Sequence, residues 1–271
     1  MEHRPIAYQV YSARDDAQKD LGSVLKQLAA MGYDGVEFAG GVYGNDPLQV
    51  KAWCEELGLV PISGHLNAKL LRERKDLIDA YATIGCRYLA MSSPDYEMMP
   101  WTDRAEEFYA FLREIGQLAK EKGMQFCFHN HDADLRPMGD TTALDLIYDN
   151  VDADLLQTEL DLCWVYSAGI DPVIYINRYK DRSRIIHCKD SNGRFREVYY
   201  KWHGGDFEQI KKTLGEMEFR PVGHGMLSYP AIMKAIDNTD IEWLIVEQDR
   251  PNGGMTSLEC AQKSVEYLKS F

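Results

Sequence analysis

The sequence lacks several features that would point to membranes, secretion or disulfide bonds. Its longest uncharged apolar stretches, such as residues 243–246, fall far short of the roughly 20 residues that a membrane-spanning helix needs. Residues 1–5 (MEHRP) contain no apolar stretch of the kind found in secretory signals. No C-x-x-C pair occurs, and most of the six cysteines lie in apolar surroundings, at positions 54, 86, 127, 163, 188 and 260. We therefore expect buried free thiols in a cytoplasmic protein.

Basic residues are also scarce. The chain has 30 Lys and Arg against 43 Asp and Glu, which gives a formal charge of −13. Contacts with phosphates depend on clustered Lys and Arg, so this composition argues against a nucleic-acid partner. Apolar residues make up 45% of the 271 residues and aromatic residues 11%. This is enough for a large core, and it excludes intrinsic disorder as the dominant state.

Short β-rich runs alternate with amphipathic helical patterns along the whole sequence. The predicted strands are residues 6–10, 35–38, 59–64, 87–91, 124–130, 155–161, 184–188 and 242–247. The predicted helices are residues 17–31, 47–57, 72–84, 101–122, 141–148, 172–179, 229–236 and 257–268. Eight strands that are each followed by a helix are typical of a (β/α)₈ barrel, whereas an open doubly wound sheet usually has fewer strands and a G-x-G-x-x-G turn after the first strand. We predict an α/β fold, a single (β/α)₈ TIM barrel formed by residues 1–271 as one domain.

Residues 190–225 form a longer segment than an ordinary connection in such a barrel. The segment carries aromatic and basic residues, namely Phe195, Tyr199, Tyr200, Lys201, Trp202 and His203. We expect this segment to cover the mouth of the barrel. Outward-facing aromatic and Met residues elsewhere are compatible with a homo-oligomer.

Polar residues gather at the carboxyl ends of the predicted strands, which is where TIM barrels form their active sites. They are His65 at the end of the third strand, residues 129–132 (HNHD) at the end of the fifth, residues 159–161 (ELD) at the end of the sixth, residues 187–190 (HCKD) at the end of the seventh and residues 247–249 (EQD) at the end of the eighth. Strand side chains alternate between two faces, so His129 and His131 share a face, as do Glu159 and Asp161.

Three consecutive strands can bring two carboxylates and an imidazole to one place if Asp161, His187 and Glu247 point inward. Such ligands suit a divalent ion such as Mn²⁺, Mg²⁺, Co²⁺ or Zn²⁺. Without a cation, the carboxylates would repel each other and raise each other's pKa. The sequence therefore predicts a metal site. Glu159 is either a further ligand or a buried carboxylate paired with Lys189 or Arg184, and His65 is either a site residue or a hydrogen-bonded structural histidine.

Several motifs occur in a characteristic order from one end of the chain to the other. They are residues 9–14 (QVYSAR), 28–37 (LAAMGYDGVE), 128–131 (FHNH), 159–161 (ELD), 168–172 (AGIDP), 187–190 (HCKD), 222–225 (VGHG) and 246–249 (VEQD). With these motifs the sequence resembles the xylose isomerase-like TIM-barrel superfamily of sugar phosphate isomerases and epimerases. That group includes ketose 3-epimerases, inosose dehydratases and endonuclease IV.

The resemblance implies a divalent ion held by Asp161, His187 and Glu247. In the epimerases a fourth ligand is a Glu at the end of the fifth strand, which also acts as an acid and base. This sequence has His129 at that position, and it has Trp164 where the epimerases have a histidine. We expect Glu159, or one of His129 and His131, to complete the metal shell.

The resemblance also implies a metal-dependent isomerase or epimerase that acts on a small keto-sugar or polyol through an enediolate. Glu247 is then the predicted base, His129 or His131 the partner acid, and His65 and Lys189 the groups that bind substrate hydroxyls or the developing oxyanion. One alternative is a lyase, either of the inosose dehydratase type or one that eliminates from a keto-glycoside. An alternative of another class is a non-catalytic sugar-binding barrel, and the charge of −13 argues against DNA repair.

Overall fold

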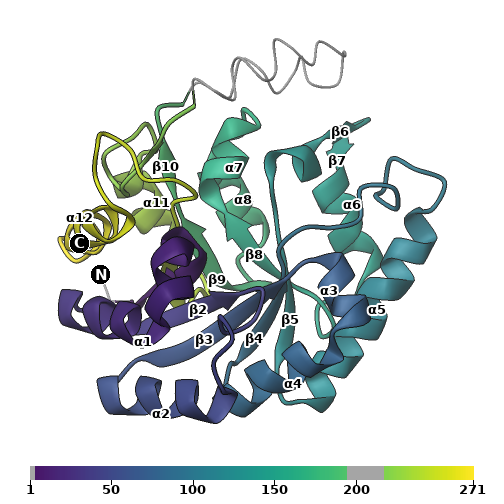
Figure 1. The fold of residues 1–271 in the computed structure, drawn as a ribbon. Coiled ribbons are helices and arrows are strands. Elements are labelled where there is room, and N and C mark those ends of the chain that lie inside the picture. The colour runs from purple at the N-terminus through teal and green to yellow at the C-terminus, as the bar shows by residue number, and fades with distance from the viewer. Residues whose placement is uncertain (1–3, 194–216) are drawn as a thin grey trace.

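The strands of the protein close into an eight-stranded parallel barrel, shown in Figure 1. The structure is a computed structural model that describes residues 4–193 and 217–271. The order around the barrel is β1 (Ile6–Gln9), β2 (Gly35–Ala39), β3 (Val60–Leu66), β4 (Tyr88–Met91), β5 (Gln125–His129), β8 (Gln157–Asp161), β9 (Ser183–Cys188) and β12 (Trp243–Val246). The first and last strands pair in parallel, with Ala7 opposite Ile245, and so close the barrel. The predicted TIM barrel and its eight predicted strands are confirmed.

Helices surround these strands in Figure 1. They are α1 (Arg14–Met31), α2 (Pro47–Leu57), α3 (Ala68–Glu73), α4 (Lys75–Ile84), α5 (Ala105–Glu121), α6 (Ala143–Asn150), α7 (Leu162–Ser167), α8 (Pro172–Arg178), α11 (Tyr229–Ile236) and α12 (Ser257–Leu268), with short 3₁₀ helices at Val10–Ala13 and Asp132–Leu135. Local signals set their ends. At α2, for example, the Asp46 side chain accepts the N–H groups of Leu48 and Gln49, and Gly58 ends the helix with a φ of 69°.

The structure corrects two helix predictions. The predicted helix at 72–84 is interrupted, because Arg74 between α3 and α4 has φ −125° and ψ 62°, outside the helical region. Helix α7 follows Asp161 directly and was absent from the predicted elements. It has only six residues, nearly all of them apolar, so it shows no amphipathic period.

The long segment after β9 begins and ends in a short antiparallel ladder. Its two strands are β10 (Asp190–Ser191) and β11 (Phe219–Arg220), while β6 (Pro137–Met138) and β7 (Thr141–Thr142) form a second small ladder. The aromatic and basic residues on which the predicted cover depends, at 195–203, lie outside the described residues.

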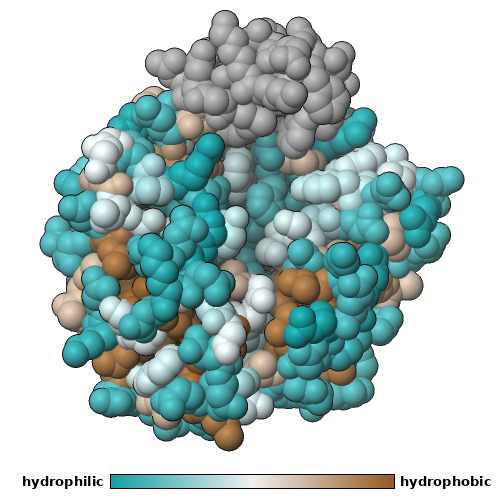
Figure 2. Space-filling view, in the orientation of Figure 1, coloured by the Kyte–Doolittle hydropathy of each residue, from teal (hydrophilic) through white to brown (hydrophobic). Residues whose placement is uncertain are grey.

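Two further predictions concern thiols and membranes. All six cysteines are buried and free, as predicted. Within residues 4–193 and 217–271, every helix is too short or too polar to span a bilayer. Figure 2 shows a mostly hydrophilic surface on one face of the molecule, with small separate hydrophobic patches.

The alternation of strand side chains divides the core into two clusters. The larger cluster lies between the strands and the helices and includes Phe38, Leu89 and Phe126. The smaller cluster fills the inside of the barrel with Ala7, Ile62, Tyr88, Ala90, Cys127, Ile185, Trp243 and Ile245. Two residues further along four of these strands, the buried side chains become polar: Gln9, His129, His187 and Glu247. The apolar filling therefore supports a polar layer at the carboxyl ends of the strands.

Candidate metal centre

Four residues predicted for the site converge at the ends of four adjacent strands. Donor atoms of His129, Asp161, His187 and Glu247 lie within 4.8 Å of one another, and all four side chains are buried. His187 Nδ1 lies 3.0 Å from Glu247 Oε2, and His129 Nε2 lies 4.0 Å from Asp161 Oδ2. We call these four residues the upper cluster.

Local structure aims one oxygen of Asp161 into this cluster. Oδ1 accepts the N–H of Trp164 at 2.9 Å and thereby caps α7. The Asn130 side chain holds the end of β8, since it accepts the Asp161 N–H at 3.0 Å and donates to the Asp161 carbonyl at 3.3 Å. Among the residues that the structure describes, the buried Oδ2 makes no hydrogen bond, although Lys189 Nζ lies 3.2 Å away. Asp161 therefore keeps one oxygen available for a cation.

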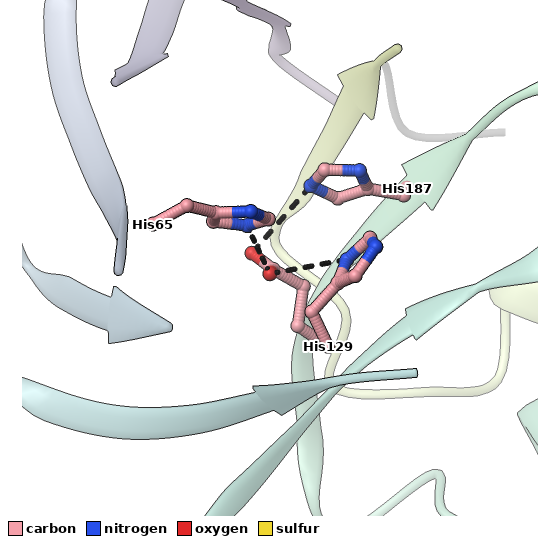
Figure 3. A group of neighbouring side chains, drawn as sticks. His65, His129 and His187 are labelled. Carbon is pink, nitrogen blue, oxygen red and sulfur yellow. Dashed lines mark hydrogen bonds and ion pairs between the residues drawn. The ribbon is translucent and has the colours of Figure 1, made fainter. Parts of the chain in front are cut away.

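Glu159 lies deeper in the barrel and faces three imidazoles, as Figure 3 shows for the rings of His65, His129 and His187 around one carboxylate. Glu159 Oε2 is 2.6 Å from His65 Nε2 and 3.4 Å from His129 Nδ1. Glu159 Oε1 is 3.7 Å from His187 Nε2. Glu37 Oε1 lies beside them, 2.7 Å from His187 Nε2 and 3.1 Å from His65 Nε2. We call Glu37, His65 and Glu159 the lower cluster.

The rings of His129 and His187 connect the two clusters. In each ring one nitrogen faces a carboxylate of the upper cluster and the other nitrogen faces a carboxylate of the lower cluster. A histidine that binds a metal commonly donates its second N–H to a carboxylate, which fixes the orientation of the ring. With an ion in the upper cluster, Glu37 and Glu159 are placed to accept those N–H groups. The structure thus puts Glu159, predicted as a ligand, one layer below Asp161 and Glu247.

Sequence reasoning missed Glu37 as a site residue. This carboxylate is fully buried, accepts a hydrogen bond from Gln9 Nε2 at 2.7 Å and accepts another from the Ser63 hydroxyl. The available signal was its position as the single charged residue within the predicted strand 35–38. A carboxylate inside an otherwise apolar strand needs polar partners, which the barrel interior provides.

Lys189 is buried within the carboxylates of the site. Its Nζ lies 2.8 Å from Glu247, 3.0 Å from Asp249 and 3.2 Å from Asp161. Burial alone would lower the pKa of Lys189, but Asp161, Asp249 and Glu247 raise it well above its ordinary value. The ammonium is therefore charged and held by carboxylates, which places this predicted substrate-binding residue beneath the cavity surface.

The next residue holds the backbone at Lys189 in place. The carboxylate of Asp190 accepts N–H groups from Ser191, Gly223, Gly225 and Leu227. A side chain at Gly225 would collide with Asp190, since a Cβ there would lie 2.1 Å from Asp190 Oδ1. The VGHG motif is therefore a turn around a buried carboxylate.

Neighbouring charges and burial give the imidazoles of the site different pKa values. Burial opposes protonation of His65, but the carboxylates of Glu37 and Glu159 raise its pKa to about 10. Burial first and the charge of Lys189 second lower the pKa of His131 to about 3. Burial also lowers the pKa of His129, and neighbouring imidazoles add to that shift. His131 is thus a neutral imidazole at neutral pH.

The upper cluster opens into a cavity of about 800 Å³. Glu247, His65, His129 and His131 line the cavity together with the aromatic rings of Tyr11, Trp164 and Phe219 and the rim residues Arg14 and Arg250. A few polar groups on a partly apolar wall are typical of a site for a small molecule.

The residues present fit a divalent ion in the upper cluster. The carboxylates of Asp161, Glu247 and Asp249 outnumber the one ammonium, that of Lys189, which contacts all three. Two imidazoles and two carboxylates form a donor set that suits Mn²⁺, Co²⁺ or Zn²⁺. The buried Oδ2 of Asp161 is the atom that such an ion would satisfy.

Comparison with known proteins identifies the family of the chain. Residues 25–271 match the family described as "Xylose isomerase-like TIM barrel". The chain belongs to this family. The inosose dehydratase of Lacticaseibacillus casei is 24% identical over 270 residues, covering 90% of this chain and 87% of that protein. The family resemblance inferred from the motifs is therefore confirmed.

Solved structures share the fold across almost the whole chain. A sugar phosphate isomerase/epimerase from Parabacteroides distasonis superposes with a TM-score of 0.78 at 22% identity, covering 99% of this chain and 98% of that one. An L-ribulose 3-epimerase has a TM-score of 0.68 at 14% identity, with 98% and 94% covered. At these identities the similarity establishes the architecture of the barrel.

Proposed function

We propose that this protein is a divalent-metal-dependent enzyme that removes a proton from the carbon next to the carbonyl of a small keto-sugar or polyol-derived ketone, and that it acts as an isomerase or epimerase. The observation that carries the proposal is the upper cluster, in which buried donor atoms of two imidazoles and two carboxylates converge beside the cavity. His129, Asp161, His187 and Glu247 would hold Mn²⁺, Mg²⁺, Co²⁺ or Zn²⁺, and the ion would supply Lewis-acid polarisation of the substrate carbonyl.

Glu247 is the proposed base. Its Oε2 contacts His187 and Lys189, which leaves Oε1 as the oxygen to face a substrate in the cavity. Burial alone would raise the pKa of Glu247, but Lys189 and His187 hold it well below its ordinary value, so the carboxylate is ionised and can accept a proton. Removal of that proton leaves the substrate as an enediolate.

His131 is the proposed second proton-exchanging group. It lines the cavity, and its buried Nδ1 has no hydrogen-bond partner among the described residues. His129 has both ring nitrogens directed at carboxylates, which suits a ligand better than a proton donor. His65 faces the cavity from β3 and can bind a substrate hydroxyl. Lys189 forms ion pairs with Glu247 and Asp161 and so stabilises their ionised forms.

Dehydration is the second candidate, and the inosose dehydratase relatives support it. Elimination starts with the same proton removal; the C–O bond at the neighbouring carbon then breaks, and the leaving hydroxyl group takes up a proton and departs as water.

The charge of −13 supports a small-molecule substrate over a nucleic acid, because contacts with phosphates depend on clustered Lys and Arg. We also propose that residues 1–271 act as one domain and that the protein works in the cytoplasm.

The test is a panel of keto-sugars and inososes incubated with the ion-loaded protein in D₂O and followed by NMR. An isomerase or epimerase places a solvent deuterium on the carbon that is reprotonated, whereas dehydration leaves the deprotonated carbon in a double bond. An isomerase or epimerase yields a product of unchanged mass apart from deuterium, whereas a dehydratase yields one that has lost water. Binding of these sugars without exchange or loss of water would favour the non-catalytic sugar-binding barrel.

A further inference from the structure

We propose that the substrate of this protein carries a second hydroxylated ring, joined to the ring with the ketone, and that a cavity beside the cavity of the upper cluster binds this second ring. The substrate class is then a keto-disaccharide. The proposal rests on the proposed function for the position of the ketone. It adds a part of the substrate that a single keto-sugar does not have.

The second cavity adjoins the first one after β1 and β2. Its volume is about 700 Å³, and Tyr11, Arg14, Ala39 and Gly40 line both cavities. The N–H of Gly40 donates to the carbonyl of His65 at 2.9 Å, so the boundary lies beside a residue that is proposed to bind a substrate hydroxyl. A pocket of roughly 300–1,000 Å³ holds a whole small ligand. Each cavity is in this range, so the two together offer more room than one sugar ring needs.

The boundary between the cavities is open at Gly40. Its backbone has a φ of 70°, which favours glycine. Within the part of the chain that the structure describes, a Cβ at this position would meet no atom within 4 Å other than those of its chain neighbours. A substituent on the ring above the upper cluster can therefore pass Gly40 and enter the second cavity.

The Tyr43 hydroxyl is a group that the second ring can satisfy. Tyr43 lines the second cavity, and its hydroxyl oxygen is buried without a hydrogen bond among residues 4–193 and 217–271. Burial raises the pKa of Tyr43 to about 12, and the charge of Arg14 opposes this shift, so the hydroxyl lies near a residue that lines both cavities. Buried hydroxyls are normally paired, and a sugar hydroxyl would supply the partner.

The loop holds Tyr43 in a strained conformation. With a φ of 55°, Tyr43 is the only residue other than glycine with a positive φ in the described ranges. The Asn45 side chain supports this turn, because its Nδ2 donates to the carbonyls of Val42 at 2.9 Å and Tyr43 at 3.3 Å. Such strain persists only where the surroundings enforce it, and it is common at binding sites. The loop therefore fixes the tyrosine on the wall of the cavity.

Arg14 provides further donors at the boundary. Its Nη1 donates to the carbonyls of Tyr11 at 3.0 Å and Asp249 at 2.9 Å, and its guanidinium lies 4.4 Å from the centre of the Tyr11 ring. These contacts orient the guanidinium and use one of its three nitrogens. The Tyr11 ring is itself 42% exposed. A hydroxylated ring can pack its C–H groups on this aromatic side chain and accept hydrogen bonds from Nε or Nη2 of Arg14.

The rest of the wall favours a neutral, polar ring. Arg74 and Asp76 line the second cavity and pair with each other through two hydrogen bonds, at 2.8 Å and 2.7 Å. The neutral amides of Gln18 and Asn45 lie on the same wall. These groups can bind hydroxyls without requiring a charged partner. A sugar ring therefore matches this wall better than an apolar group or a phosphate.

The experiment compares disaccharides in which one glucose ring is oxidised to a ketone with the matching oxidised glucose, on the full chain loaded with Mn²⁺. The panel varies the linkage and the second sugar, and it includes a phosphorylated ketohexose. The measured quantity is kcat/KM or, for sugars that do not react, the affinity by calorimetry. Each added hydrogen bond between neutral groups contributes about two- to tenfold, so we expect the best disaccharide to exceed the monosaccharide about tenfold or more.

Two variants locate this gain in the second cavity. Tyr43→Phe should lower it about two- to tenfold, since it removes one hydrogen bond. Ala80→Trp should abolish the gain, because Ala80 in α4 lines the second cavity but not the first, and a large side chain there fills the space. Tyr96→Phe, which removes the hydroxyl of an exposed tyrosine that stacks on Trp101, is the matched control and should keep the whole gain. Circular dichroism checks that each variant is folded.

The outcomes separate this proposal from the proposed function. Turnover of keto-monosaccharides without a gain for any disaccharide overturns the second-ring site and leaves the proposed function. A gain in affinity that Ala80→Trp abolishes, without turnover of any sugar, supports the site and counts against the proposed function. A gain confined to the phosphorylated sugar, or one that Tyr43→Phe and Ala80→Trp leave intact, overturns the second-ring site. A protein that neither binds nor converts any of these sugars overturns both.

Discussion

Several site residues use their two polar atoms for two different partners. Asp161 caps α7 with Oδ1 and faces the upper cluster with Oδ2. His187 faces Glu247 with Nδ1 and Glu37 with Nε2. The first contact of each pair fixes the direction of the side chain, and this direction in turn points the second polar atom at its own partner. Residues of this kind should be sensitive even to isosteric changes.

Glu247→Gln tests the proposed base. The amide keeps the shape of the side chain but cannot take up the proton, and general base catalysis contributes about 10²–10⁴ in rate. We expect turnover and deuterium exchange to fall below a few per cent of wild type on any substrate found. Glu242→Gln, which changes an exposed glutamate beside β12, should react at the wild-type rate. Activity above a few per cent, with the ion content unchanged, would remove Glu247 from this role.

At the scale of elements, small residues allow helices to lie close to the barrel. Gly116 in α5 is an example, because a Cβ at this position would lie 2.3 Å from the carbonyl oxygen of Leu155. Leu155 precedes β8, the strand that carries Glu159 and Asp161. The approach of α5 thus helps to set the position of a strand that forms the site.

Gly116→Ala should therefore destabilise the fold. Overpacking of this kind typically costs about 1–3 kcal/mol in the free energy of unfolding. Gly22→Ala in α1 is the matched control, since its Cβ would meet its nearest atoms at 3.5 Å, an ordinary van der Waals separation. Urea unfolding should show the first variant less stable and the second at least as stable as wild type. Equal effects would contradict the close approach.

Asp145 joins α6 to α8. Its carboxylate completes a capping box with Thr142 and accepts hydrogen bonds from Arg178 at 2.6 Å and the Tyr179 hydroxyl at 2.5 Å. Burial alone would raise the pKa of Asp145, but the hydrogen bonds from Tyr179, Arg178 and Thr142 outweigh it and lower the pKa below its ordinary value. The ionised form is therefore the one that stabilises the fold.

The sign of the pH dependence follows from that shift. The unfolded chain protonates Asp145 near pH 3.9, and the folded chain does so at a lower pH. The contribution of Asp145 is thus complete above about pH 4 and is lost as the pH falls through the lower, folded pKa. Asp145→Asn should reduce the free energy of unfolding at pH 7 by about 1–3 kcal/mol and flatten its fall in acid. Exposed Asp149→Asn, on the same helix, should do neither, which urea titrations at several pH values can check.

For the whole molecule, closure of the barrel concentrates negative charge at one end. Asp161, Glu247 and Asp249 surround Lys189, and Glu37 and Glu159 lie beneath them. These carboxylates stay together because the apolar cluster inside the barrel holds their strands in register. Bound cations should therefore contribute to the stability of the entire fold.

Removal of divalent ions should lower the melting temperature, and Mn²⁺ should restore it. An ion present at 100 times its dissociation constant adds about 2.7 kcal/mol to the folded state. Asp161→Ala and His187→Ala should contain less bound metal than wild type by elemental analysis and respond less to Mn²⁺ in calorimetry. A wild-type chain that stays metal-free in excess Mn²⁺, with an unchanged melting temperature, would count against the upper site and favour the sugar-binding barrel.

Local sequence patterns were sufficient to predict most of the strands and helices of this protein. Short β-rich runs marked the eight strands, amphipathic patterns marked most of the helices, and strand-end positions indicated Asp161, His187 and Glu247 as candidate site residues. These signals act over a few residues, so they can be recognised without tertiary contacts. Helix α7 escaped prediction because it is too short to show an amphipathic period, and the break at Arg74 escaped because no Gly or Pro marks it.

Only the tertiary structure decided how the site residues are layered. Glu37 and His187 are 150 residues apart in sequence, yet they lie 2.7 Å apart once β2 and β9 enter the same barrel. Which nitrogen of His129 or His187 faces which carboxylate depends on barrel closure and on the stagger between neighbouring strands. The sequence by itself determined the fold and most members of the candidate site. The closed barrel determined which of these side chains face one another, because those contacts exist only between different strands of the barrel.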